Sequence, residues 1–231
     1  MLTLDKLLIV QDDFRLSADF TLARGTRTAV LGPSGAGKST LLTTLAGFVV
    51  PSAGRVLWED TDITDMAPGA RPLSILFQDQ NLFPHLSVAQ NLGLGISPRP
   101  RLSGAEQAQI AAALERVGLA GLGARKPGAL SGGQQGRVAL ARCLLRARPL
   151  LLLDEPFAAL GPALKADMLA LVAEIAAEQG TTVVMVSHDP ADAEALCPQT
   201  VLLAEGVAAP PQPTAALLAD PPPALAAYLG R

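Results

Sequence analysis

Short apolar segments alternate with helical patterns and polar turns along the chain. Apolar and β-branched runs bounded by glycine, proline or charged residues predict strands, at 2–10, 15–22, 28–31, 55–58, 73–77, 150–155 and 181–187. Apolar residues at helical spacing predict helices, at 41–46, 105–117, 134–145, 165–179 and 190–196. Because strands alternate with helices, we expect an α/β fold with a largely parallel sheet.

The middle and the end of the chain differ in pattern from the rest. The alanine-rich segment after residue 81 predicts a helical insertion within the sheet, and Ser103 and Glu106 have the spacing of a capping box at a helix start. Repeated prolines after Ala208 predict loosely attached short helices rather than another domain. We therefore expect one domain, with a core at about 1–80 and 148–207, an insertion at about 81–147 and a tail at about 208–231.

Composition and charge limit the function classes. The chain has 231 residues, of which 49% are hydrophobic, but no apolar run approaches the roughly 18 residues of a membrane span. The N-terminus does not have the pattern of a secretory signal, so we expect a cytosolic protein. The net charge is −3 without long runs of one sign, so we expect no nucleic-acid partner. Cys143 and Cys197 lack metal or redox spacing and are expected to be buried apolar residues.

A glycine-rich stretch at 32–39 follows the pattern G-x-x-x-x-G-K-[ST] between a predicted strand and a predicted helix. Gly35 and Gly37 let successive backbone N–H groups turn into one concavity, and the helix N-terminus adds partial positive charge. Lys38 adds a charge for the β- and γ-phosphates, and the Ser39 hydroxyl is a ligand for Mg²⁺. We therefore expect a nucleoside triphosphate site formed by Gly32, Pro33, Ser34, Gly35, Ala36, Gly37, Lys38, Ser39 and Thr40.

Four further polar side chains follow predicted strands. Asp154 has the chemistry to reach Mg²⁺, and Glu155 has the chemistry to polarise a water aimed at the γ-phosphate. His188 is expected to contact the same phosphate, and Gln78 to reach either the metal or the attacking water. Because ligands collect at the carboxyl ends of parallel strands, these residues and the phosphate loop are expected to form one site.

The segment 130–135, Leu-Ser-Gly-Gly-Gln-Gln, resembles the signature of ABC-type ATPases. Its position after the phosphate loop and Gln78, and before 150–155 and His188, matches that family along essentially the whole chain. The resemblance implies a P-loop NTPase (RecA-like) core with a mainly parallel sheet, an antiparallel N-terminal β-subdomain and an inserted α-helical subdomain. It also implies ATP as the substrate and Mg²⁺ as the metal.

The signature residues themselves predict a second anion site, because backbone amides and a serine hydroxyl lie at a helix start. The resemblance implies that two copies pair head to tail, so that the signature of one closes over ATP held by the other. ATP would close the pair, and hydrolysis would let it reopen. The signature residues that this assigns to ATP are Ser131, Gly132, Gly133 and Gln134.

The resemblance also implies a role for each polar residue at the strand ends. Glu155 would be the general base and His188 the sensor of the γ-phosphate. Lys38 and the metal would neutralise charge that develops during hydrolysis. The implied metal ligands are Ser39, Gln78 and Asp154.

Membrane partners are implied as well. Residues 82–86, Leu-Phe-Pro-His-Leu, would contact a permease at the cytoplasmic face of the bacterial inner membrane, with a periplasmic binding protein acting indirectly. The alternative is that Phe83 and Leu86 are merely core residues of the insertion. Segments 77–86 and 91–95 look like those of bacterial importers.

Residues 154–165 are similar to the ATPases of thiamine importers. Iron(III), polyamine and molybdate importers are the alternatives, and a non-transport ABC ATPase of a soluble complex is a further one. A GTPase is excluded because the sequence lacks an N-K-x-D run.

Two positions depart from the family pattern. An aromatic residue in an early strand of the family usually stacks on adenine, and Phe14, which follows Gln11, Asp12 and Asp13, is the candidate here. The family normally has an Ala-Leu-Asp ending after the catalytic carboxylates, whereas this chain has Ala159, Leu160 and Gly161. In the family this Asp helps the two sites of a dimer to communicate. A glycine has no carboxylate, so Gly161 cannot make that contact.

Overall fold

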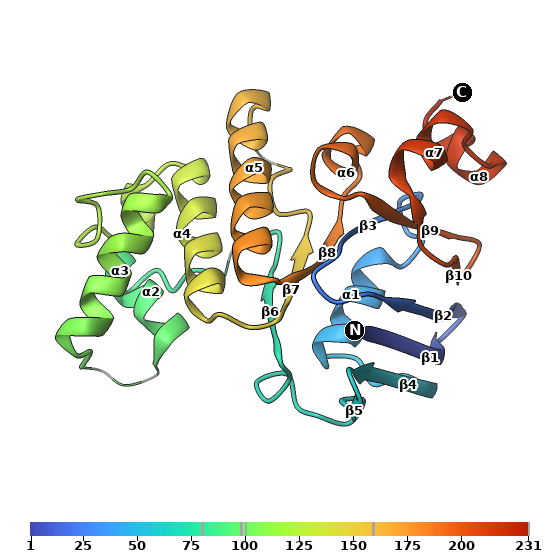
Figure 1. Ribbon diagram of the computed structural model, residues 1–231, viewed down its shortest axis with the longest axis horizontal. Helices are drawn as coiled ribbons and strands as arrows, with labels where there is room; N and C mark the ends of the chain where they lie inside the picture. Colours follow the sequence, from blue (N-terminus) through green and yellow to red (C-terminus); the bar gives the residue numbers. More distant parts are fainter. Residues whose placement is uncertain (80, 98, 100, 159, 231) are drawn as a thin grey trace.

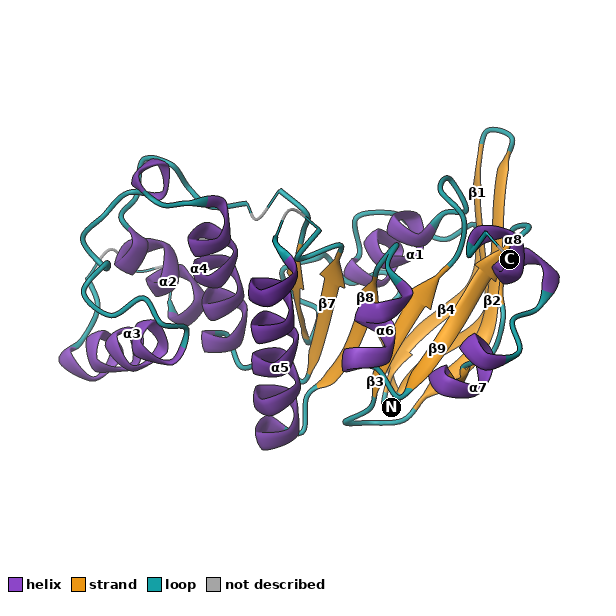
Figure 2. Ribbon diagram, turned by 90° about the horizontal axis from the view of Figure 1, so that it is seen from above, coloured by secondary structure: helices purple, strands orange, loops and turns teal. Residues whose placement is uncertain are grey.

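The computed structural model describes residues 1–79, 81–97, 99, 101–158 and 160–230 (Figure 1). The molecule is elongated, with helices α2, α3 and α4 at one end and the strands β1, β2 and β4 at the other (Figures 1 and 2). Ala159, in the segment 159–161 that differs from the family pattern, lies outside the described residues. Among the helices described here, none is long and apolar enough to cross a bilayer.

The centre of the molecule is a parallel sheet with the strand order β9-β3-β8-β7-β6. These strands are nearly all buried, as expected for a parallel sheet covered on both faces. Their bounds are β3 Arg27–Leu31, β6 Leu73–Leu76, β7 Leu150–Asp154, β8 Thr182–Val186 and β9 Gln199–Ala204.

An antiparallel layer continues this sheet in the order β5-β4-β1-β2. The short strand β10 joins the two parts, because it pairs with both β2 and β9. The short strand β11 pairs with β9. The bounds are β1 Leu2–Gln11, β2 Phe14–Leu22, β4 Ala53–Trp58, β5 Thr61–Asp62, β10 Val207–Ala208 and β11 Gln212–Pro213.

The helices fall into three groups. Core helices are α1 Lys38–Ala46, α5 Pro162–Gln179 and α6 Pro190–Leu196. The insertion contains α2 Val88–Ile96, α3 Gly104–Arg116, the 3₁₀ turn Pro127–Ala129 and α4 Gly132–Leu145. The tail contains α7 Thr214–Ala219 and α8 Pro223–Tyr228.

Alternate residues of the parallel strands belong to two different cores. Leu150 and Leu152 pack with α1 and the antiparallel layer, whereas Leu151 and Leu153 pack with α4, α5 and α6. A third apolar cluster lies within the insertion, on α2, α3 and α4. Trp58, the single tryptophan of the chain, is only 7% exposed and lies opposite Leu2 in the antiparallel layer.

Arg71 fixes the end of the helix that follows the phosphate loop. Its side chain is 1% exposed and donates hydrogen bonds of 2.9 and 2.8 Å to the carbonyls of Thr44 and Leu45 at the end of α1. It also donates to the carbonyls of Thr64 and Met66. Burial lowers the pKa of Arg71, and Asp65 and Asp62 oppose that shift. The guanidinium thus supplies the donors that these buried helix-end carbonyls need.

The predicted fold class is confirmed: the parallel core, the antiparallel N-terminal layer and the inserted helices are all present. The capping box of Ser103 and Glu106 is confirmed at the start of α3. Both cysteines are buried, and burial raises the pKa of Cys143 to about 11 and that of Cys197 to about 12. Helix α2 and strand β9 had not been predicted.

The expectation of a loosely attached tail was wrong. Short helices do form, but Leu225 is fully buried and Leu217 is 4% exposed. The hydroxyl of Thr214 donates a 2.6 Å hydrogen bond to the carbonyl of Cys197. The tail is therefore packed on the core, because its leucines supply the apolar contacts that the prolines alone do not indicate.

Candidate functional site

The phosphate loop connects β3 to α1, as its sequence pattern predicts. Gly37 is the residue before α1 and has φ 100°, a left-handed conformation that favours glycine. A Cβ at this position would lie 3.0 Å from Cδ1 of Leu16 and closer still to the ring of Phe14. Both the backbone angle and the crowding therefore require glycine here.

Phe14 lies at the first position of β2, half-buried, with its ring against Gly37. The aromatic ring is thus next to the loop that would hold the phosphates. This location is compatible with the expected contact to adenine, and that contact stays a prediction.

Lys38 is the first residue of α1, and its ammonium is directed back at the loop. Nζ donates hydrogen bonds of 2.7 Å to the carbonyl of Gly32 and 2.9 Å to that of Pro33. The residue is 8% exposed, and burial lowers its pKa, although Glu155 and Asp154 oppose this shift. A cation is therefore held at the loop beside two carboxylates, where phosphate oxygens would replace the carbonyls as partners.

Two of the three predicted oxygen ligands of Mg²⁺, Ser39 and Asp154, are adjacent. The Ser39 hydroxyl donates a 3.0 Å hydrogen bond to Oδ1 of Asp154 at the end of β7. Burial raises the pKa of Asp154, the Ser39 hydrogen bond opposes that shift, and the charge of Glu155 adds to it. A partly desolvated carboxylate beside a hydroxyl is a donor set that suits a hard divalent cation.

Gln78 lies at the same edge of the sheet. It is exposed and follows β6, where Leu76 is opposite Leu153 of the parallel strand β7. The carboxyl ends of β6 and β7 therefore lie together, with Gln78 and Asp154 one or two residues further along the chain.

Glu155 and His188 meet at the ends of neighbouring strands β7 and β8. Nδ1 of His188 lies 3.2 Å from Oε2 of Glu155. The Glu155 N–H donates a 3.0 Å hydrogen bond to the carbonyl of Val186, and its φ of 45° turns the chain away from the strand. The His188 side chain is 56% exposed and that of Glu155 is 25% exposed, so both groups are accessible at this edge.

A lysine on α5 holds the loop that follows β8. Nζ of Lys165 lies 2.6 Å from Oδ2 of Asp189 and 2.7 Å from Oδ1 of Asp192. The hydroxyl of Ser187 donates a 2.9 Å hydrogen bond to the other oxygen of Asp192 and accepts one of 3.0 Å from the Asp189 N–H. Lys165 lowers the pKa of Asp189, and Asp189 and Asp192 raise that of Lys165. We refer to residues 187–189 as the sensor loop.

The signature lies at the start of α4. Ser131 is the N-cap: its hydroxyl accepts a 3.3 Å hydrogen bond from the Gln134 N–H, and its own N–H donates one of 3.0 Å to Oε1 of Gln134. Ser131 and Gly132 are exposed, while Gly133 packs against Leu164 of α5. Along the long axis of the molecule, α5 and β7 separate α4 from α1 (Figures 1 and 2). The signature and the phosphate loop of one chain are therefore apart.

The segment 82–86 is held by a buried asparagine of α2. The side chain of Asn91, which is fully buried, accepts a 2.8 Å hydrogen bond from the Phe83 N–H. It also donates to the carbonyls of Phe83, Leu86 and Ser87, at 3.1, 3.3 and 3.0 Å. Phe83 is 45% exposed, so its assignment to the core of the insertion is wrong.

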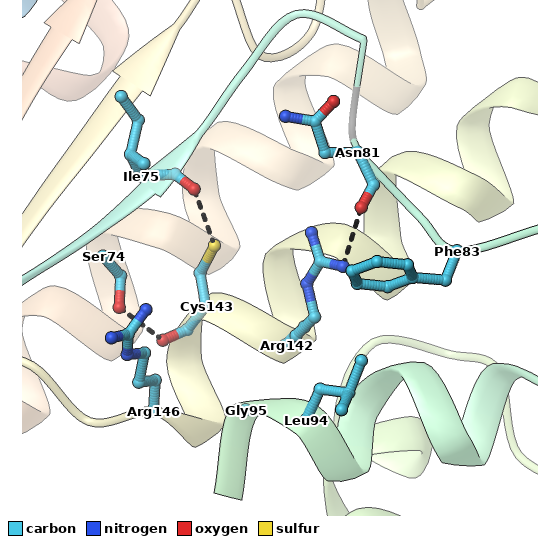
Figure 3. Close-up of a pocket in the computed structure, with 9 residues that line it drawn as sticks. All are labelled: Ser74, Ile75, Asn81, Phe83, Leu94, Gly95, Arg142, Cys143 and Arg146. Carbon is cyan, nitrogen blue, oxygen red and sulfur yellow. Dashed lines mark hydrogen bonds between the residues drawn. The ribbon is translucent and has the colours of Figure 1, made fainter. Parts of the chain in front are cut away.

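Phe83 borders a pocket between the insertion and β6 (Figure 3). The pocket has a volume of about 270 Å³. Figure 3 shows Arg142 of α4 beside the Phe83 ring, with its guanidinium 6.0 Å from the ring centre and donating a 2.8 Å hydrogen bond to the carbonyl of Asn81. Arg146 and the exposed Leu94 also line it. The pocket thus combines apolar and cationic walls.

Several of these residues were missed from the sequence. Asn91 belongs to the segment 91–95, whose sequence resembles that of bacterial importer ATPases. The sequence did not predict that its side chain holds the 82–86 segment. Lys165 and Arg142 had no recognisable spacing, because each makes its contact through the tertiary fold. Asp189 could have been found as the N-cap of α6, because it precedes Pro190 at a predicted helix start.

Residues 16–158 match the sequence profile of the family described as ABC transporter. The chain belongs to the ABC transporter family. ABC ATP-binding proteins are ATPases, and this cassette binds and hydrolyses ATP.

Two relatives match the cassette over its full length. One, from Cereibacter sphaeroides, is 68% identical over 230 residues, and another, from a Ruegeria species, is 57% identical over 230 residues. Each alignment covers 100% of both chains, and each relative is named thiamine import ATP-binding protein ThiQ. A solved dimeric structure of an ATP-binding cassette, in a post-hydrolysis state with ADP and Pi, matches with a TM-score of 0.81 and 27% identity. It covers 93% of this chain and 99% of that chain.

Proposed function

We propose that this cassette is the ATP-hydrolysing motor of a bacterial thiamine importer, and that it works as a head-to-tail dimer at the cytoplasmic face of the inner membrane. The observation that carries the motor assignment is the Glu155–His188 pair beside Ser39 and Asp154 at one sheet edge. The thiamine assignment is supported by the full-length relatives at 68% and 57% identity, which are named for thiamine import.

The proposed chemistry is phosphoryl transfer to water. The loop amides and Lys38 bind and orient the β- and γ-phosphates. Glu155 accepts a proton from the attacking water, and His188 contacts the γ-phosphate from the other side. Mg²⁺, for which the oxygen ligands Ser39, Asp154 and Gln78 fit, supplies charge neutralisation on the phosphate oxygens.

The proposed dimer uses the exposed signature. Ser131 and Gly132 present a hydroxyl and backbone amides at the N-terminus of a 14-residue helix, which favours anions. Because the phosphate loop of the same chain is remote, we assign these groups to ATP bound by a second copy. The dimeric state of the similar cassette with ADP and Pi supports this assembly.

The proposed permease contact is the pocket beside Phe83. Its exposed aromatic ring and the two arginines, Arg142 and Arg146, favour a permease segment with apolar side chains and an acidic group. The segment 82–86 begins four residues after Gln78, so a movement at the γ-phosphate would reach this contact through a short length of chain.

The dimer and the catalytic base are tested together by Glu155→Gln. With ATP and Mg²⁺ the variant is expected to form a stable dimer by size-exclusion chromatography with light scattering, because ATP binds but the water is not activated. Adding Ser131→Arg to the same chain should return it to a monomer, since it blocks the signature. A Glu155→Gln variant that stays monomeric at saturating ATP would refute the composite site.

The transported substrate is tested in the host bacterium. Deleting the gene is expected to abolish uptake of radiolabelled thiamine. The intact gene supplied on a plasmid should restore uptake, and the Lys38→Ala variant should not. Thiamine uptake that persists in the deletion strain, with loss of iron(III), polyamine or molybdate uptake instead, would overturn the thiamine assignment and leave the motor assignment in place.

A further inference from the structure

The C-terminal tail contacts the catalytic edge. Tyr228, at the end of α8, donates a hydrogen bond from its hydroxyl to the backbone carbonyl of His188. Helix α8 is fixed in this place because Leu225 is fully buried and the helix packs on β9. The tail had been expected to be loose, and instead it places a phenol on the sensor loop.

The fold restrains His188 mainly through its backbone. Its side chain is 56% exposed, so packing does little to fix the imidazole. The residue after it, Asp189, is tied to Lys165 at 2.6 Å, and the residue before it, Ser187, is tied to Asp192 at 2.9 Å. The Tyr228 hydroxyl adds a hydrogen bond to the His188 carbonyl, in the peptide between His188 and Asp189. This bond restrains the His188 backbone, from which the imidazole extends.

The surroundings of the phenol suit a donor. Tyr228 is half-buried, and burial together with the charges of Glu155 and Asp189 raises its pKa. The hydroxyl therefore keeps its proton at neutral pH and donates it to the carbonyl oxygen. The hydrogen bond to the His188 carbonyl places the phenol beside the Glu155–His188 pair.

We propose that Tyr228 is a positioning residue for ATP hydrolysis, which holds the His188 backbone so that the imidazole stays aligned with Glu155 and the γ-phosphate. This inference rests on the proposed roles of Glu155 and His188. It adds to them a requirement that the tail be docked for full turnover. Tyr228 does not touch the substrate and acts only through His188.

The test removes the hydroxyl and keeps the ring. Tyr228→Phe is expected to lower kcat for ATP about fivefold, the order of one lost hydrogen bond to an aligned group, with KM for ATP within about twofold of the wild-type value. Thr26→Val is the matched control, because the Thr26 hydroxyl also donates to a backbone carbonyl, that of Ala23 at 2.7 Å, away from the catalytic edge. Its kcat should equal that of the wild type.

A double mutant separates positioning from general destabilisation. In a His188→Ala background, Tyr228→Phe should have no further effect on kcat, because the side chain that it positions is gone. An additive loss would overturn the inference. A Tyr228→Phe variant with wild-type kcat, in a protein whose kcat is lowered by His188→Ala, would overturn it too. A fully active His188→Ala variant would instead refute the proposed role of His188.

The unmutated tail offers a second measurement. Tyr228 is the single tyrosine of the chain, so 3-fluorotyrosine places one ¹⁹F signal at this contact. In the Glu155→Gln protein, ATP with Mg²⁺ is expected to shift this signal, because the sensor loop rearranges around the γ-phosphate, whereas ADP should shift it less. Identical signals with ATP, with ADP and without nucleotide would contradict a role in positioning.

Discussion

The hydroxyl of Ser39 lies 3.0 Å from Oδ1 of Asp154, although 115 positions separate the two residues in the chain. Ser39 is in the first turn of α1, and Asp154 ends β7. Because α1 passes under the parallel sheet from β3 towards β7, the helix start and the strand end meet at one edge. The fold thus brings together a hydroxyl and a carboxylate from distant parts of the chain.

This pair makes the metal dependence of turnover testable. Ser39→Ala is expected to raise the Mg²⁺ concentration that half-activates the ATPase by about tenfold, because one of few oxygen ligands is lost. The measurement is ATP turnover against free Mg²⁺. Thr43→Val on the same helix serves as the control, since the Thr43 hydroxyl bonds to the helix carbonyls of Ser39 and Thr40 and is not aimed at Asp154. Equal Mg²⁺ dependence of the Ser39→Ala variant and the wild type would contradict the ligand assignment.

The bond between Lys165 and Asp189 predicts a pH-dependent stability. Asp189 has a lowered pKa, so its contribution is present above the ordinary pKa of about 4 and is lost as the pH falls through the folded-state value. Lys165 has a raised pKa, so its contribution is present below its ordinary pKa of about 10.4 and is lost as the pH rises through the folded-state value. The pair therefore stabilises the fold between these limits.

Lys165→Met is the matching variant. With the two side chains 21% and 35% exposed, its loss is expected to lower the free energy of unfolding at pH 7 by about 1 kcal/mol, after allowance for solvent screening. That corresponds to a fall in Tm of about 2–4 °C for a chain of this size. Urea unfolding at pH 7 and pH 3 checks this, and the difference from the wild type should shrink at pH 3. A difference of the same size at both values would mean that packing of the lysine stem, and not its charge, is responsible.

Gly161 offers a gain-of-function test. It is the exposed N-cap of α5, with no side-chain cap and with open space around its Cα. Gly161→Asp is expected to raise turnover without changing the affinity for ATP, because it restores a carboxylate at the position where the family has one. It should also stabilise α5 by a few tenths of a kcal/mol as an N-cap.

Gly161→Asn separates these two effects. The amide caps the helix equally well but carries no charge, so it should give the stability gain without the increase in turnover. Both variants are compared by calorimetry and by steady-state ATPase assays. Turnover of Gly161→Asp at or below the wild-type level would show that the missing carboxylate does not limit hydrolysis.

Asn91 holds the 82–86 segment, which is the proposed contact with the permease. Asn91→Leu has a similar volume but leaves three hydrogen bonds to the 82–86 segment and one to Ser87 unmade. We expect thiamine uptake to fall by about tenfold or more while the ATPase activity of the isolated cassette stays within about twofold, because the segment is displaced from the permease and not from the phosphate loop. Gln109→Leu, at an exposed position of α3 in the same insertion, is the control. Equal losses of uptake and isolated ATPase activity would argue against a coupling role.

The sequence predicts those parts of the site that depend on local pattern. The strand–loop–helix at 32–39 and the capped helix at Ser131 have spacings that demand one backbone geometry, and both are present. The polar residues after buried strands, Asp154 and His188, could be placed at one edge because parallel strands point the same way. Their catalytic roles stay predictions.

The missed features depend on contacts between distant segments. The sequence of helix α2 contains Gly93 and Gly95, which lower its helix propensity. The helix is stabilised instead by packing around the buried Leu92. Strand β9 lies just before the tail, whose repeated prolines predicted only loosely attached helices. The Tyr228–His188 contact joins residues 40 positions apart through a proline-rich segment, and no local pattern encodes such a pairing.

The isolated position of Trp58 has a consequence for unfolding experiments. The indole is buried in the antiparallel layer, at the opposite end of the molecule from the inserted helices (Figure 1). Tryptophan fluorescence therefore follows the melting of that layer alone, whereas far-ultraviolet circular dichroism is dominated by the helices. Coincident curves would mean that the whole cassette melts as one cooperative unit, and a later fluorescence midpoint would mean that helices melt before the antiparallel layer.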